Sequence, residues 1–149
     1  MKTLLFAFVG CLIANLASAG GPASACVEPN EAVQQTLITI QTQASFDFGD
    51  VDVNACQKIV NKGVKLCKEQ VKAAAKCWKK DTSTVKDIAV KQCNQLESAK
   101  ERAGCKDFFK AQKEDIDGDV DADKDESLDE CEGGFADELA DDCAVGVPT

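Results

Sequence analysis

The chain has 149 residues, nine of them cysteine and none histidine, and a formal net charge of −9. Without histidine neither a Ser-His nor a Cys-His nucleophile pair can form, and nothing indicates a concave site for a carboxylate pair, so we expect no enzymatic activity. Seven Phe, one Trp and no Tyr leave few large side chains for a core, a situation in which small domains rely on covalent crosslinks.

Residues 1–19 have the features of a secretory signal peptide. Lys2 supplies a positive start, residues 4–16 form an apolar run broken only by Asn15, and residues 17–19 fit the small-residue cleavage pattern. A second such triplet places cleavage as late as residue 25. The apolar run is too short to span a bilayer, and no comparable run follows it. We therefore expect a secreted protein without a membrane span, or a periplasmic one if the source is bacterial.

Eight cysteines remain after cleavage, an even number that predicts four disulfides in an exported chain. They are Cys26, Cys56, Cys67, Cys77, Cys93, Cys105, Cys131 and Cys143. A zinc site fits less well, because histidine and C-x-x-C pairs are both absent. Lipidation of Cys26 fits less well too, because it would leave seven thiols and strand one of them.

Residues 56–105 have the pattern of an antiparallel helical hairpin. Apolar and thiol side chains recur at steps of three and four on both sides of a polar turn at residues 81–84. Cysteines that face each other in such a hairpin have residue numbers with a near-constant sum, here 160 or 161. The pattern thus predicts two disulfides, Cys67 with Cys93 and Cys56 with Cys105.

The segments around this hairpin are shorter. Cys77 points about 80° away from Cys67 on the helix, so we expect it to bond outside the hairpin, and Gly104 is a candidate for the end of the second helix. Residues 30–40 fit a short helix, although residues 37–40 are also β-prone. Two further short helices are predicted, one around Phe108 and Phe109 and one over residues 135–143. The alternatives for the last two cysteines are Cys131 with Cys143, or one of them with Cys77 or Cys26.

Charge is divided unevenly along the chain. Residues 56–113 hold 15 Lys or Arg against 6 Asp or Glu, whereas residues 114–149 hold 15 Asp or Glu against Lys124 alone. We therefore expect an all-α fold: a small disulfide-stapled helical domain at residues 26–113, built on the hairpin, followed by an acidic, partly irregular tail at residues 114–149. Export excludes most encounters with nucleic acid, so the basic helix face is either solvated or an interaction surface.

The acidic tail contains a run of alternating aspartates. Residues 121–132 resemble the EF-hand calcium loop, in which oxygens at positions 1, 3, 5, 7, 9 and 12 surround one hard cation. The resemblance implies a Ca²⁺ site whose ligands are Asp121, Asp123, Asp125, the Ser127 carbonyl, Asp129 and Glu132. The segment departs from the family at position 6, where Glu126 stands in place of glycine. The alternative to a calcium site is a disordered acidic linker.

Two functions follow from these patterns. In the first, the chain is a secreted calcium-binding module that carries the aspartate-rich loop on a crosslinked helical scaffold. In the second, it is a small secreted interaction protein of the effector, toxin or pheromone type, which binds an extracellular protein through the basic hairpin while the acidic tail shields that surface.

Overall fold

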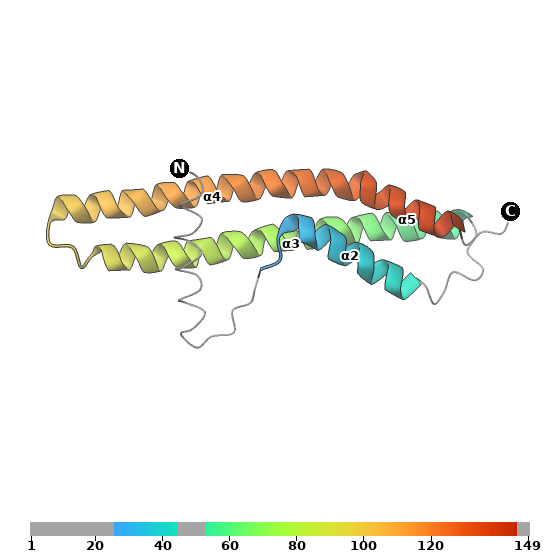
Figure 1. Cartoon of the computed structure of the whole chain (residues 1–149), viewed down its shortest axis with the longest axis horizontal. Helices are drawn as coiled ribbons and strands as arrows, with labels where there is room; N and C mark the ends of the chain where they lie inside the picture. Colours follow the sequence, from blue (N-terminus) through green and yellow to red (C-terminus); the bar gives the residue numbers. More distant parts are fainter. Residues whose placement is uncertain (1–25, 45–52, 146–149) are drawn as a thin grey trace.

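The computed structural model describes residues 26–44 and 53–145. Within these residues all regular secondary structure is helical: α2 (Pro29–Ala44), α3 (Val53–Cys93), α4 (Ala99–Glu132) and α5 (Gly134–Val145) (Figure 1). Four disulfides join the helices. The predicted all-α, disulfide-stapled fold is therefore confirmed, and the β-prone residues 37–40 are helical. The predicted signal peptide lies outside the described residues. No described helix has an apolar stretch long enough to cross a membrane.

A long antiparallel hairpin of α3 and α4 dominates the molecule (Figure 1). The predicted turn at residues 81–84 is wrong, because α3 runs through it without interruption for 41 residues, or about 60 Å. The hydroxyls of Thr82 and Thr84 donate to the carbonyls of Trp78 and Lys80, four residues earlier, at 2.8 and 3.1 Å. These bonds satisfy the hydroxyls inside the helix, so the polar run continues it instead of breaking it.

The true turn lies at residues 94–98 and is fixed by a capping box. The Ser98 hydroxyl accepts from the Glu101 amide at 3.0 Å, and the Glu101 carboxylate accepts from the Ser98 amide at 3.4 Å. The Arg102 guanidinium donates to the carbonyls of Leu96 and Glu97 at 2.7 and 2.8 Å, which closes the turn onto α4. Gly104 was a predicted candidate for the end of the second helix, but it lies inside α4.

The disulfides follow from this longer hairpin. The pairs are Cys26–Cys77, Cys56–Cys143, Cys67–Cys131 and Cys93–Cys105. The predicted Cys67–Cys93 and Cys56–Cys105 pairings are wrong, and so are all the alternatives named for Cys131 and Cys143. The expectation that Cys77 bonds outside the hairpin is confirmed. The last three pairs have residue numbers that sum to 199, 198 and 198, so the constant-sum rule holds about a turn near residue 99.

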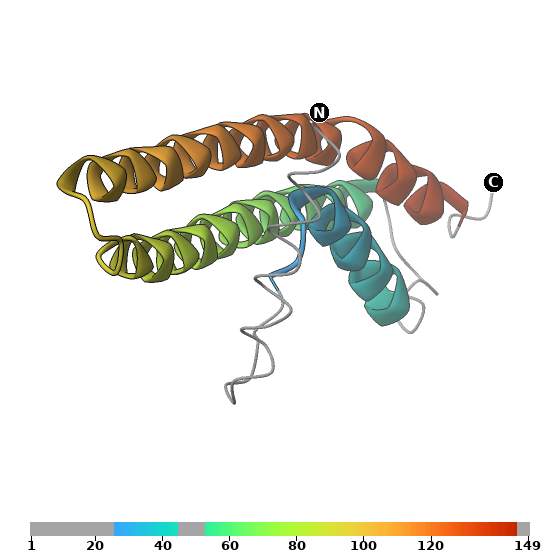
Figure 2. The ribbon, with the colours of Figure 1, turned by 60° about the vertical axis from the view of Figure 1, so that its left-hand side comes forward.

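The hydrophobic core lies at one end of the hairpin, where α2 and α5 pack onto α3 and α4 (Figure 2). Its buried side chains include Val33 and Leu37 of α2, Val71 of α3, Cys131 of α4, and Phe135 and Leu139 of α5. Gly63 allows the close approach of these helices, because a Cβ there would lie 2.6 Å from Cδ1 of Leu139. The core therefore draws on all four described helices.

The acidic C-terminal segment belongs to this bundle. Residues 114–132 continue α4 without a break, so the predicted boundary at 113/114 falls inside a helix. α4 ends at Glu132 and is capped by Gly133, whose amide donates to the Asp129 carbonyl at 2.9 Å; α5 begins at Gly134. α5 confirms the helix predicted over residues 135–143, with Phe135, Leu139 and Cys143 buried.

Candidate functional site

The six residues of the predicted calcium loop all lie on the C-terminal half of α4. Residues 121–132 form regular helix in place of the expected loop, which points side chains two positions apart in nearly opposite directions. Ser127 is buried, whereas Asp123, Asp125 and Asp129 are exposed. The helix therefore does not gather these oxygens around one point, and calcium binding by this segment stays a prediction from the sequence alone.

The two outermost predicted ligands instead form ion pairs with α3. Glu132 pairs with Lys68, and the Asp121 carboxylate accepts from the Lys79 ammonium at 2.6 Å. Both the acids and the lysines are eleven residues apart, about three helical turns, so the two pairs lie along one side of the hairpin. The hydrogen bond from Lys79, helped by a second from Lys124 at 3.1 Å, lowers the pKa of Asp121. The same contact raises the pKa of Lys124.

One metal-like cluster occurs among the described residues. Cys26, Cys77 and Asp81 bring two sulfurs and a carboxylate oxygen within 4.8 Å of one another. The two cysteines form a disulfide, so their sulfurs are not thiolate ligands, and the cluster is not a metal site. Its role is structural, because the Cys26–Cys77 disulfide anchors the start of α2 to α3. Beside it the Trp78 indole donates a hydrogen bond of 3.1 Å to the Val27 carbonyl.

The other half of the hairpin extends beyond the bundle. We call residues 79–113 the uncovered arm, and residues 26–44, 53–78 and 114–145 the bundle end. The contacts of Cys77 and Trp78 mark where α2 begins, and from there to the turn α3 and α4 are the only described helices that run side by side (Figures 1 and 2). The arm holds nine Lys or Arg against five Asp or Glu, a charge of +4, whereas the bundle end holds seven against 18, or −11.

Among the described residues, the ion pairs between α3 and α4 stop at Lys79, the first residue of the arm. One further step of eleven residues leads from Lys79 to Val90 on α3 and from Asp121 to Lys110 on α4. A lysine therefore lies on α4 at the position where the two ion pairs have an acid. Among the ion pairs of the described residues, none includes Lys106 or Lys110. Lys86 and Lys113 differ, because each has a carboxylate neighbour on its own helix. The hydrogen bond from Lys86 lowers the pKa of Asp87.

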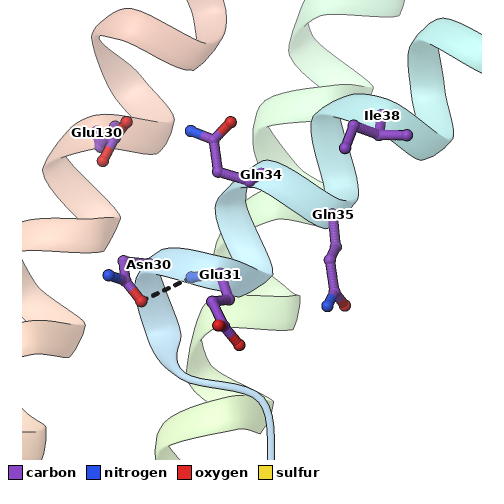
Figure 3. A pocket seen from close by; sticks show the side chains of 6 residues that line it. All are labelled: Asn30, Glu31, Gln34, Gln35, Ile38 and Glu130. Atoms are coloured by element: carbon purple, nitrogen blue, oxygen red, sulfur yellow. Dashed lines mark hydrogen bonds between the residues drawn. The ribbon is translucent and has the colours of Figure 1, made fainter.

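Two concave features of the described surface lie at the bundle end. One is an open pocket between α2 and α4, lined by Asn30, Glu31, Gln34, Gln35, Ile38 and Glu130 (Figure 3). Its side chains point outward from two helices, and the one hydrogen bond drawn among them, from the Glu31 amide to Asn30 Oδ1 at 2.7 Å, is local. The second is a groove of 460 Å³ between α2 and α3, lined by Leu66 and Cys77 among others.

Comparison with known protein families, with characterised proteins and with solved structures finds no match for this chain. The candidate site therefore rests on the geometry of the described residues. Sequence reasoning recognised the basic hairpin but misplaced its end, and so it missed Lys106 and Lys110 as cations that take part in none of the ion pairs of the described residues. The capping box at Ser98 and Glu101 is the sequence signal that marks the true turn.

Proposed function

We propose that this chain is a secreted, non-enzymatic binding protein whose uncovered arm recognises an anionic macromolecular partner. The observation that carries the proposal is that some lysines of the hairpin form ion pairs with acids across the two helices and others do not. The acidic half of α4 pairs with Lys68 at the bundle end and with Lys79 at the base of the arm, whereas nearer the tip Lys106 and Lys110 take part in none of the ion pairs of the described residues. The acidic segment thus makes the bundle end negative, at −11, and leaves the arm, at +4, as the cationic surface.

Distance makes this separation effective in spite of the negative net charge. From Ala99 to Lys113 the arm extends along α4 for about 22 Å. The Debye length at physiological ionic strength is about 8 Å, so the charge of the bundle end is largely screened at the tip. An anionic partner is therefore repelled by one end of the rod and attracted by the other, which orients its approach.

Charge reversal in the arm tests the proposal. Heparin, a soluble sulfated polyanion, serves as the probe, and the salt concentration that elutes the protein from a heparin column is the readout. We expect Lys106→Glu/Lys110→Glu to elute at clearly lower salt than wild type, because each lost cation removes a counterion-releasing contact. The matched control is Lys58→Glu/Lys62→Glu, which makes the same charge change at exposed positions of the bundle end.

Elution of the arm variant at the wild-type position would refute the proposal. So would an equal loss in both variants, because retention would then depend on net charge and not on the arm.

A further inference from the structure

The four disulfides differ in how deeply their cysteines are buried. Three of them have at least one fully buried cysteine, namely Cys143, Cys93 and both members of the Cys67–Cys131 pair. In the fourth, Cys26 and Cys77 are both half-buried, so each residue reaches solvent. Among the disulfides of the described residues, Cys26–Cys77 is therefore the one in which neither cysteine is enclosed.

The groove between α2 and α3 leads to this bond. Cys26 and Cys77 both line the groove, together with small side chains such as Ala32 and Ala73. Its volume of 460 Å³ is many times that of a water molecule, about 30 Å³, so a small thiol has room to approach either sulfur.

The burial of the cysteines matters because of the way disulfides exchange. A thiolate attacks one sulfur and forms a mixed disulfide, while the other cysteine leaves as a thiolate. A leaving thiolate that forms away from solvent is disfavoured, since burial in apolar surroundings raises the pKa of a thiol. Attack at Cys56, for example, would leave Cys143 as a thiolate cut off from solvent. Either cysteine of the Cys26–Cys77 pair can leave toward solvent instead.

A carboxylate lies against this pair. Oδ2 of Asp81 is 3.1 Å from Sγ of Cys26, and Asp81 follows Cys77 on α3 by four residues, about one helical turn. Its charge repels a thiolate that attacks Cys26, and it also opposes the Cys26 thiolate that forms when Cys77 is attacked. Asp81 therefore slows exchange on both routes, and it slows an anionic thiol more than a cationic one.

We propose that Cys26–Cys77 is a thiol-exchange site in this groove, and that Asp81 biases the exchange toward cationic thiols. The first thiolate forms a mixed disulfide with one cysteine and releases the other, which takes up a proton. A second thiolate then displaces the remaining cysteine, which is protonated in turn. Two thiols are thus oxidised to one disulfide, while Cys26 and Cys77 gain two electrons and two protons. This chemistry goes beyond polyanion binding and uses none of the cations of the arm.

Reduction of this bond frees α2 without unlinking the other helices. The other three disulfides hold α3, α4 and α5 to one another, whereas Cys26–Cys77 joins the start of α2 to α3. α2 also packs through Val33 and Leu37, which are buried in the core. The reduced form should therefore keep its helices, while α2 opens from the bundle at a lower free energy than in the crosslinked form.

Alkylation after limited reduction identifies the exchange site. The folded mature protein is treated with a small excess of 2-mercaptoethanol, free thiols are blocked with iodoacetamide, and peptide mass spectrometry locates the blocked cysteines. We expect Cys26 and Cys77 to be labelled first, while the far-UV circular dichroism stays that of the untreated protein. Simultaneous labelling of all four pairs, earlier labelling of another pair, or loss of helix with this pair alone reduced would overturn the proposal.

The role of Asp81 is tested with thiols of different charge: cationic cysteamine, neutral 2-mercaptoethanol and anionic 3-mercaptopropionate. Asp81→Asn should speed exchange at Cys26–Cys77 at least about threefold with 3-mercaptopropionate, less with 2-mercaptoethanol and least with cysteamine. Each thiol is compared with itself on wild type and variant. The comparison therefore cancels the pKa of the thiol and the effect of the lysines on the same helix, Lys76 and Lys80.

The matched control is Glu69→Gln. It removes the same formal charge from an exposed position of α3 that lies eight residues, or about 12 Å, before Cys77. It should leave all three exchange rates close to those of wild type. An equal acceleration by Glu69→Gln, the same acceleration with all three thiols, or rates unchanged in Asp81→Asn would rule out the part assigned to Asp81.

Discussion

The bundle end and the uncovered arm are built from the same two helices, yet different forces hold them together. At the bundle end α3 and α4 bury apolar side chains against α2 and α5, and three of the four disulfides tie these helices to one another. In the arm a single disulfide, Cys93–Cys105, closes the tip, and only Ala89 and Cys93 are fully buried between residues 79 and 113.

This difference separates stability from recognition. Two helices alone cannot bury an apolar stripe on all sides, so the arm keeps Phe108 and Leu96 exposed while the bundle end hides Phe135. Elements with few buried contacts open at lower free energy than a core, and binding surfaces are commonly drawn from them. The bundle end thus provides the rigid base from which the arm projects.

Truncation of one phenylalanine in each region tests the comparison with the largest effect. Phe135 is 2% exposed in the core, so Phe135→Ala should lower the free energy of unfolding by about 3 to 5 kcal/mol, as core aromatic truncations do. Phe108→Ala should change it by no more than about 0.5 kcal/mol, because that ring is largely in solvent. Denaturant unfolding of dilute protein with intact disulfides measures both. Similar losses in the two variants would mean that the arm contributes to the core.

Replacing glycines tests how tightly the helices pack, with a smaller expected change in stability than the phenylalanine truncations. Leu139 and Ile40 approach Gly63 so closely that Gly63→Leu overpacks the bundle end and should cost about 1 to 3 kcal/mol. Gly118, inside α4, has nothing within 4 Å of its Cβ direction, so Gly118→Ala should stabilise the helix by about 0.5 to 1 kcal/mol. Thermal unfolding compares the two. A neutral Gly63→Leu would show that α5 does not pack against α3 at this point.

The helical fold and the hairpin could be predicted because apolar periodicity is a local property of the sequence. The place of the turn could not be read from the polar run at residues 81–84, since Thr82 and Thr84 find carbonyl partners inside the helix. The constant-sum rule for cysteines was sound, but more than one position of the turn satisfies it. A turn at residues 81–84 accounts for two pairs, whereas a turn near residue 99 accounts for three.

The acidic segment was harder to predict from sequence. Like charges at helical spacing destabilise an isolated helix by only a few tenths of a kcal/mol per pair, which tertiary contacts readily exceed. Here Lys68 and Lys79 lie opposite Glu132 and Asp121, and the Cys67–Cys131 disulfide holds the two helices together at this level. None of these partners is close in sequence to the acids, so the EF-hand-like spacing was the only local pattern available.

The smallest expected effect concerns the Lys79–Asp121 ion pair, where the arm meets the bundle end. The hydrogen bond from Lys79 lowers the pKa of Asp121, so the folded state binds a proton there less readily than the unfolded chain does. The stabilisation is therefore fully present above the unfolded pKa, about 4, and is lost as pH falls through the folded value. Asp121→Asn should flatten the dependence of the melting temperature on pH below about pH 4. High salt should have a similar effect on wild type, because it screens a solvent-accessible pair.

Asp123→Asn is the matched control for this measurement. Asp123 is exposed, lies about 200° from Asp121 around α4, and takes part in none of the ion pairs of the described residues. Its replacement should leave the acid limb of the melting profile as in wild type, although it removes the same formal charge. If both variants flattened the profile equally, the pH dependence would reflect the overall repulsion among the acids of α4. The boundary between the acidic bundle end and the cationic arm would then not be set by the Lys79–Asp121 pair.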